Sequence, residues 1–302
     1  MKILTFAAID IGSNAIRLLI MNVVENRKAP VYRKTNMIRV PVRLGDEAFS
    51  DKKLSPAKIE RLMLAMKSFR YLMDATGITS YRACATSAMR EATNSAEVVK
   101  QIAIESGIKI EVIEGKEEAD IIYSTHVEEM LDHKSSYLYV DVGGGSTELT
   151  LFAKNKLVDS RSFNLGTVRY LKGIVNKEDE KEMKKWVKKT TAKHKPLHVI
   201  GSGGNINKIF KLSGEKAKKN ASVSIEQVTQ VYKLVKSYSV EERIKNLDMD
   251  PDRADVILPA AQIFLDIMKV CGSRRIYVPR IGLADGIIRQ LYREYKVKPK
   301  TS

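Results

Sequence analysis

Hydrophobic positions along the chain follow two patterns, one typical of strands and one typical of helices. Short apolar runs at residues 4–9, 137–140 and 197–200 have the length of strands and are rich in branched or aromatic residues. Between residues 56 and 77, apolar residues instead recur at helical spacing, after a Ser55–Pro56 pair that suits a helix start. Because strands and helices alternate in both halves of the chain, we predict α/β lobes with parallel strands wherever a helix crosses over.

The same criteria locate the other elements. Strands are expected at residues 4–9, 15–24, 30–40, 81–84, 108–113, 137–140, from 148, at 156–163, 197–200 and 275–278. Helices are expected at residues 56–77, 95–106, 115–131, 176–195, after 205, at 224–237, 241–247, 253–270 and up to 295.

Two of the predicted strand pairs enclose turns of similar composition. Asp10 ends an apolar run and is followed by Gly12, Ser13 and Asn14 before a strand returns. Asp141 begins the same sequence of acid, glycine-containing turn and returning strand 131 residues later. We interpret this recurrence as a duplicated lobe, with ordinary hairpin turns that recur by chance as the alternative. The second turn consists of Gly143, Gly144, Gly145, Ser146, Thr147 and Glu148.

These turns have the chemistry of an anion site. Glycine lets a ligand approach the backbone closely, and successive N–H groups in such a turn form a concavity for an anion. Asp141 and Glu148 add carboxylate oxygens, which a divalent cation prefers. Phosphate with Mg²⁺ is therefore the expected ligand. A strand-to-helix turn at residues 201–205, which includes Gly203, presents N–H groups at a helix start in the same way.

Composition favours an anionic partner. The chain has 302 residues, of which 44% are hydrophobic, and this suits a globular protein of two domains. Its net charge of +16 favours binding to nucleic acid, polyphosphate, nucleotide or acidic lipid, with a solvated basic surface as the alternative. No groove-reading helix, zinc finger or aromatic-studded RNA sheet is evident, so sequence-specific nucleic-acid binding is not expected.

Several features exclude other classes of protein. Cys84 and Cys271 are too few for a disulfide framework or a zinc cluster, and we expect both to be buried. No signal peptide is evident and no apolar run reaches the ~18 residues that span a bilayer, so we expect a cytoplasmic protein without a membrane partner. The histidines lie outside every motif and have no metal-ligand spacing: His126, His133, His194 and His198.

Five segments, in this order along the chain, resemble the signature sequences of one family. They are residues 10–17 (DIGSNAIR), 85–91 (ATSAMRE), 115–119 (GKEEA), 141–148 (DVGGGSTE) and 201–204 (GSGG). Together they resemble the Ppx/GppA family of exopolyphosphatases and guanosine pentaphosphate phosphohydrolases, within the superfamily of actin, sugar kinases and heat-shock ATPases. The resemblance runs from about residue 3 to about residue 294.

The resemblance implies a fold and an activity. It implies two actin-like, ribonuclease H-like lobes at residues 1–125 and 126–302, with the option that the last helix packs back on the first lobe. The active site would lie in the cleft between the lobes. The implied reaction is hydrolysis of a phosphoanhydride, which releases orthophosphate from the end of inorganic polyphosphate or the 5′-γ-phosphate of pppGpp, with Mg²⁺ or Mn²⁺. A homodimer is the implied assembly.

Matching positions within the motifs suggest roles for single residues. Glu118 resembles the family's general base and Arg90 its phosphate-clamping arginine. From the residues alone, Glu118 is also explained as an ordinary acid of a first helical turn, and Arg90 as the ion-pair partner of Glu91 or another acid. The implied metal carboxylates are Asp141 and Glu148, with Asp10 as a third. The implied phosphate loops are Gly12, Ser13 and Asn14, and Gly143, Gly144, Gly145, Ser146 and Thr147, joined by Gly203 of the 201–205 turn.

Departures from the family pattern leave other functions open. The chain ends before the helical C-terminal extension of longer members, which puts a processive grip on long polyphosphate in doubt. Ala284 and Ile281 stand where the family often has arginine and tyrosine, and the first change removes a positive charge. An actin-like ATPase or kinase that uses the same loops is one alternative function, and a non-catalytic protein that binds polyphosphate or an alarmone is another.

Overall fold

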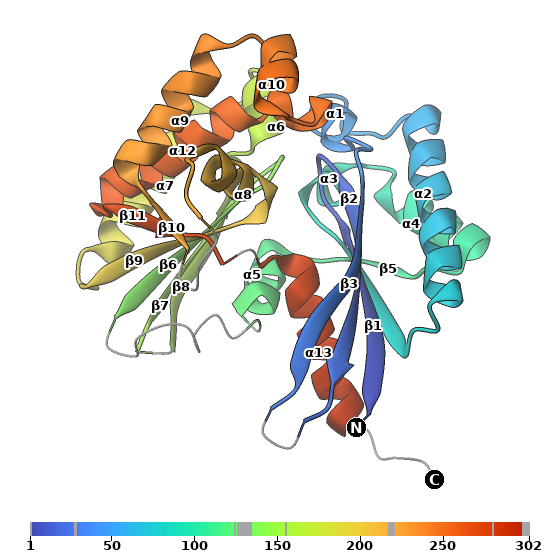
Figure 1. Ribbon diagram of the computed structural model, residues 1–302. Coiled ribbons are helices and arrows are strands. Elements are labelled where there is room, and N and C mark those ends of the chain that lie inside the picture. The colour runs from blue at the N-terminus through green and yellow to red at the C-terminus, as the bar shows by residue number, and fades with distance from the viewer. Residues whose placement is uncertain are drawn as a thin grey trace. The chain divides into compact units, whose positions relative to one another are not determined.

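Two mixed β-sheets with helices packed on them form the framework of the protein (Figure 1). The computed structural model describes residues 2–26, 29–123, 125, 135–154, 156–216, 221–279 and 281–297. The chain divides into two compact units, of which the first comprises Met1–Thr125 with Gly282–Ser302 and the second comprises His126–Ile281. The expected continuation of a helix to residue 131 falls largely on residue 124 and residues 126–131, which lie outside the described residues, as do the histidines His126 and His133.

The first unit is built on a five-stranded sheet of order β3-β2-β1-β4-β5. Its strands are β1 (Ile3–Ile11), β2 (Ile16–Val24), β3 (Val31–Val40), β4 (Ser80–Ala85) and β5 (Ile110–Val112). Its helices are α1 (Gly45–Ala48), α2 (Pro56–Ala75), α3 (Ser87–Glu91), α4 (Ser95–Ser106), α5 (Gly115–Tyr123) and α13 (Leu283–Val297). The first three strands pair antiparallel through hairpins, whereas β4 and β5 run parallel to β1 and need helical crossovers to reach their places.

The second unit is built on a six-stranded sheet of order β10-β11-β9-β6-β7-β8. Its strands are β6 (Ser136–Val142), β7 (Thr147–Ala153), β8 (Lys156–Phe163), β9 (Leu197–Ser202), β10 (Ser222–Ser224) and β11 (Arg275–Tyr277). Its helices are α6 (Thr167–Leu171), α7 (Lys177–Thr191), α8 (Gly203–Leu212), α9 (Ile225–Ser237), α10 (Val240–Leu247), α11 (Pro251–Ala254) and α12 (Ile257–Cys271).

The two sheets repeat one arrangement. The run β8-β7-β6-β9-β11 has the same order and directions as β3-β2-β1-β4-β5, and β10 is added antiparallel at one edge. Asp10 pairs with Arg17 across the first hairpin, and Asp141 pairs with Glu148 across the second. The next strand pair of each unit shifts register at a matching position, after Ile20 and after Leu151. Shared order, register and irregularity confirm the duplicated lobe that was predicted from the two turns.

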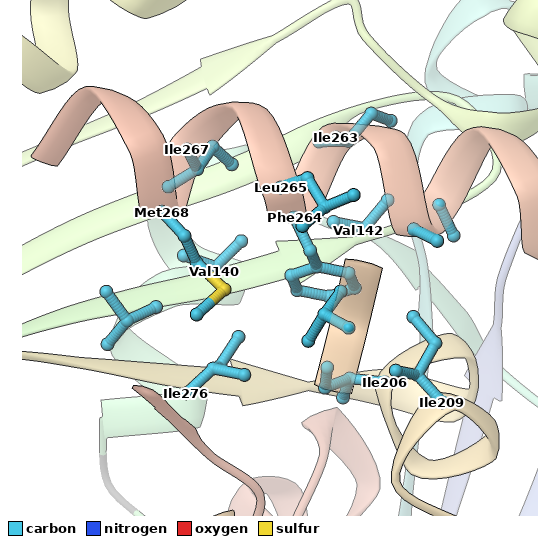
Figure 2. Close-up of a cluster of buried hydrophobic side chains, with 14 of the residues drawn as sticks. Val140, Val142, Ile206, Ile209, Ile263, Phe264, Leu265, Ile267, Met268 and Ile276 are labelled. Atoms are coloured by element: carbon cyan, nitrogen blue, oxygen red, sulfur yellow. The ribbon is translucent and has the colours of Figure 1, made fainter. Parts of the chain in front are cut away.

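The apolar core of the second unit lies between its sheet and helix α12. Figure 2 shows Phe264 and Met268 of α12 directed toward Val140 of β6 and toward Ile206 of α8. Phe264 is fully buried, and burying one such side chain contributes roughly 1.5–3 kcal/mol. This core fixes β6, at whose end the Asp141 turn begins.

The apolar core of the first unit depends on α13. Figure 1 shows this helix beside β1 and α5, both of which it contacts. Its residues Ile287, Ile288 and Leu291 belong to one buried cluster with Phe6 of β1 and Leu19 of β2. The final helix therefore packs on strands that lie far from it in the sequence.

One predicted helix is divided into two in the structure. Residues 253–270 were expected to form a single helix, but α11 ends at Ala254 and α12 begins at Ile257. Pro259 explains the break, because proline has no N–H to donate and is tolerated in the first turn of a helix but not in its interior. The short elements α1, α6 and β10 were not anticipated.

The helix starts follow the sequence signals in most places. The Ser55 side chain accepts from the Lys58 N–H at 3.3 Å and caps α2 as predicted. Asn94 makes no such cap for α4, and its side chain instead bonds the N–H and the carbonyl of Leu54. Both cysteines are buried, as expected. Among the helices of the described residues, none is long and apolar enough to cross a membrane.

Candidate active site

The first predicted phosphate loop joins β1 to β2 and is held by the segment that enters α1. The carbonyl of Ser13 accepts from the Gly45 N–H at 2.8 Å, and the carbonyl of Asn14 accepts from the Arg43 N–H at 2.9 Å. In a trans peptide, the C=O of one residue and the N–H of the next point in opposite directions. The N–H groups of Asn14 and Ala15 therefore face away from α1, as an anion-binding turn requires.

The second motif, residues 85–91, contacts this loop from another side. The Ser13 and Ser87 hydroxyl oxygens lie 2.8 Å apart, and both side chains are buried. The Gly12 N–H donates to the carbonyl of Ala15 at 3.2 Å and tightens the turn. The structure thus brings Gly12, Ser13 and the start of α3 together at one end of the sheet.

Asp10 lies at the same end of the sheet but has a cationic partner. Its Oδ2 is 2.8 Å from Nη1 of Arg17, the residue opposite it on β2. The Asp10 side chain is only 12% exposed, so water screens this ion pair less than one on the open surface. Asp10 is therefore charge-compensated within its own hairpin.

Glu118 lies in the first turns of α5 and is 9% exposed. Its Oε2 is 3.7 Å from Nη1 of Arg90, and the same nitrogen donates to the carbonyl of Ile113 at 2.6 Å. Glu91 pairs instead with Lys52 at 2.8 Å. The ion pair that was the alternative for Arg90 is thus present, but its acid is the predicted base, so the two residues form one local group.

The second predicted phosphate loop, residues 143–147, is held by the start of α6. The carbonyls of residues 143 and 144 accept from the N–H groups of Thr167 and Val168 at 3.0 and 2.8 Å, and the carbonyl of Gly145 accepts from Nε of Arg169 at 2.6 Å. With all three carbonyls turned to α6, the N–H groups of residues 144–146 face the opposite side. Three successive N–H groups on one side form the concavity expected for an anion.

Two carboxylates flank this loop. Asp141 and Glu148 are directly opposite on β6 and β7, so their side chains project from the same face of the sheet. Oε1 of Glu148 accepts hydrogen bonds from the hydroxyls of Ser146 and Ser162, the latter at 3.0 Å. Ser162 lies opposite Glu148 on β8. Glu148 is 6% exposed, so its orientation is fixed by neighbours on both sides.

Two other predicted phosphate residues have backbone roles in this unit. Thr147 is fully buried and its hydroxyl donates to the carbonyl of Leu165, so only its backbone is available to a ligand. Gly203 begins α8 with φ +90°, and a Cβ there would lie 2.9 Å from Oδ1 of Asp141. Only glycine suits this conformation and this approach, and it brings the start of α8 against the Asp141 carboxylate.

A divalent cation fits Asp141 and Glu148 by the chemistry of their donor atoms. Mg²⁺ is commonly held by one or two carboxylates together with phosphate oxygens, and this pair of acids lies next to a turn suited to phosphate. Over the described parts of the chain, no group of three or more His, Cys, Asp or Glu side chains could hold a metal ion. Asp10, predicted as a third ligand, has Arg17 as its partner instead.

Sequence reasoning missed four residues that support these groups. Arg17, Ser87 and Ser162 bond Asp10, Ser13 and Glu148, respectively, and Arg169 holds the Gly145 carbonyl. Arg17 and Ser87 lie within the quoted motifs, so their position was a usable signal. Ser162 and Arg169 depend on strand register and on the return of the chain to the turn, which no local pattern reveals.

The repeated lobe and its paired turns define an α/β protein built of two similar units. The chain belongs to the Ppx/GppA phosphatase family, whose sequence model matches residues 23–294. Four of the five motifs, those from residue 85 to residue 204, lie within the matched residues.

Curated relatives and solved structures agree with this assignment. The chain is 29% identical over 301 residues to the bifunctional 3-dehydroquinate synthase/phosphatase of Fusobacterium nucleatum, covering 90% of this chain and 44% of that relative. It is 33% identical over 180 residues to exopolyphosphatase 2 of Mycobacterium tuberculosis, covering 56% of this chain and 54% of that relative. The chain thus spans about half the length of these relatives. The crystal structure of an exopolyphosphatase from Cytophaga hutchinsonii shares the fold, with a TM-score of 0.84 and 22% identity over 96% of this chain and 98% of that one.

Proposed function

We propose that this protein is an exopolyphosphatase, a hydrolase that releases orthophosphate from the end of inorganic polyphosphate. The observation that carries the proposal is the 143–147 turn, whose three N–H groups face one side next to two carboxylates, Asp141 and Glu148. Membership of the Ppx/GppA family and similarity to an exopolyphosphatase support it. The net charge of +16 suits a polyanionic substrate.

Glu118 is the proposed general base. In the reaction, a water oxygen forms a bond to the terminal phosphorus while the bond to the bridging oxygen breaks in line with it. The water proton passes to the Glu118 carboxylate, and the shortened chain leaves with the bridging oxygen. The proximity of Arg90 to Glu118 supports this role, because a guanidinium next to the base can hold phosphoryl oxygens in place.

The two glycine-rich loops are the proposed phosphate-binding groups. Their outward N–H groups match the oxygens of a phosphate and need no rearrangement as charge develops on them. Asp141 and Glu148 would hold Mg²⁺ or Mn²⁺, which neutralises negative charge on phosphate oxygens. Asp10 would join them only by exchanging its ion pair with Arg17.

A hydrolysis panel tests the proposal. Phosphate release is measured from triphosphate, long polyphosphate, pppGpp and ATP, each with Mg²⁺ and with Mn²⁺. We expect polyphosphate to be cleaved fastest, and pppGpp to be a second substrate because its 5′ end carries the same phosphoanhydride. ATP consumption that outpaces polyphosphate cleavage would instead identify an ATPase or kinase, and tight polyphosphate binding without turnover would identify a binding protein.

A further inference from the structure

One arginine outside the five motifs joins four elements of the first unit. Arg82 of β4 donates from Nε and Nη2 to Oε2 of Glu111 on β5, at 3.0 and 2.6 Å. Nη2 also lies 2.7 Å from Oε1 of Glu117 on α5, and Nη1 donates to Oε1 of Gln290 on α13 at 3.0 Å. The Arg82 side chain is 18% exposed, and the Glu111 carboxylate raises its pKa further. Such a network fixes geometry better than a single surface pair does.

The network reaches the residue next to the proposed base. Glu117 and Glu118 are consecutive in α5, so their side chains leave the helix about 100° apart. The Glu117 side chain is 47% exposed and is held by Arg82, whereas Glu118 is buried near Arg90. A rotation of α5 about its axis that turns Glu118 also moves Glu117 relative to Arg82.

The far end of α5 is held by close packing. A Cβ at Gly286 of α13 would lie 2.1 Å from the carbonyl oxygen of Ile121, so the two helices touch through their backbones. Gln290, four residues further along α13, is the partner of Arg82. Helix α5 is therefore fixed at its start by an ion pair and near its end by backbone contact, and α13 takes part in both.

We propose that Arg82 is a positioning residue, which sets the orientation of Glu118 through Glu117. The inference rests on the proposed function, in which Glu118 is the base. A displacement of about 1 Å in a reacting group can cost about 100-fold in rate, and the Arg82–Glu117 ion pair holds the turn of α5 that carries Glu118. Loss of the tether should therefore lower kcat and leave the binding of substrate nearly unchanged.

The test compares Arg82→Met, Arg82→Lys and Glu117→Gln with a matched control, Lys67→Met. Lys67 forms an ion pair with Glu105 at 2.6 Å between α2 and α4, away from α5. We expect Arg82→Met and Glu117→Gln to lower kcat about ten-fold or more with KM within about two-fold, and Arg82→Lys to restore part of the loss. The double variant Arg82→Met/Glu117→Gln should be no slower than the worse single variant, because both changes act on the same contact.

Chemical rescue by added guanidinium is a second measurement, because Arg82 lines a groove of about 650 Å³. The groove is lined by residues that include Tyr81, Arg82 and Gln290, so a small cation can reach the position of the missing guanidinium. Millimolar guanidinium should raise the kcat of Arg82→Met and leave that of Lys67→Met unchanged. Rescue would not occur if the substitution merely loosened the fold.

The outcomes separate this inference from the proposed function. If Glu118→Gln keeps its activity, the base is misassigned and the proposed mechanism fails. If Glu118→Gln is inactive while Arg82→Met and Glu117→Gln stay within about two-fold of the parent kcat, the mechanism stands and the positioning role is overturned. Should Arg82→Met fail to fold, Glu117→Gln still decides, because in it Arg82 keeps its bonds to Glu111 and Gln290.

Discussion

At the scale of single residues, the acids of the candidate site differ in their partners. Asp10 is paired with Arg17, Glu118 lies beside Arg90, and Glu148 accepts from two serine hydroxyls. The charge of a carboxylate beside a guanidinium is already compensated. A carboxylate that accepts from neutral hydroxyls has no cationic partner among them, and a metal ion can take that place. The neutral partners of Glu148 support its proposed role as a metal ligand, whereas the role of Glu118 rests on the family resemblance and on its proximity to Arg90.

Substitution of Glu118 by Gln should remove the base and keep the side-chain volume. We expect kcat for triphosphate to fall by about 10²–10⁴-fold, the usual contribution of a general base, with little change in KM. Initial-rate phosphate release measures both constants, and a melting curve checks folding. Activity within a few-fold of the parent enzyme would show that another group takes the proton.

Substitution of Glu148 by Gln should weaken the binding of the metal. The apparent Mg²⁺ concentration for half-maximal activity should rise by about ten-fold or more, because a neutral amide replaces a charged ligand. A Mg²⁺ titration of activity measures it. Glu182→Gln is the control, since Glu182 is an exposed acid that pairs with Arg161. Equal Mg²⁺ dependence in both variants would contradict the assignment.

Sequence alone locates the chemical groups better than their supports. The glycine turns were predictable because they have local signatures, whereas the roles of Glu118 and Arg90 were predicted from the resemblance to the family. Ser162 bonds Glu148 only because strand register places it on the facing strand. The Arg82 network likewise combines residues 208 positions apart, Arg82 and Gln290, which no local pattern connects.

At the scale of elements, the strands and long helices follow their hydrophobic period, and the short elements do not. Segments such as α1 and α6 have four or five residues, too few to show a helical period, yet they hold the carbonyls of the two loops. The expected helix 253–270 divides because Pro259 requires a helix start. Elements that shape the site were therefore the least predictable from sequence.

The position of Ala284 in the first turn of α13 allows a prediction at this scale. Ala284 is 5% exposed and belongs to the buried cluster that includes Cys84 and Ile121. Ala284→Arg, which restores the residue expected from the family pattern, should overpack this core and lower the free energy of unfolding by about 1–3 kcal/mol or more.

Urea denaturation measures this change. Val297→Arg, at an 83% exposed site of the same helix, is the control and should stay within about 0.5 kcal/mol of the parent. An unchanged stability together with a lower KM for polyphosphate would show instead that an arginine at position 284 reaches the substrate.

At the scale of the whole molecule, the net charge of +16 should act on long substrates more than on short ones. Salt shortens the range of electrostatic attraction from about 10 Å at 0.1 M to about 3 Å at 1 M. Raising KCl should therefore increase KM for long polyphosphate far more than KM for triphosphate, whose few charges all lie near the catalytic groups. Steady-state kinetics over a KCl series measures both, and parallel curves would show that the basic surface does not contact the chain.

The packing of α13 has a consequence for synthesis on the ribosome. The second unit is one continuous stretch of chain and has all its strands once residue 281 has emerged. The first unit begins to emerge earlier, but its core still lacks Ile287, Ile288 and Leu291, which cover Phe6 and Leu19. Domains usually complete their folding in the order in which they are translated. Here the second unit can complete its folding first, and strands β1 and β2 keep an uncovered apolar face until α13 has emerged. An exposed apolar face of this kind is the surface that a chaperone binds.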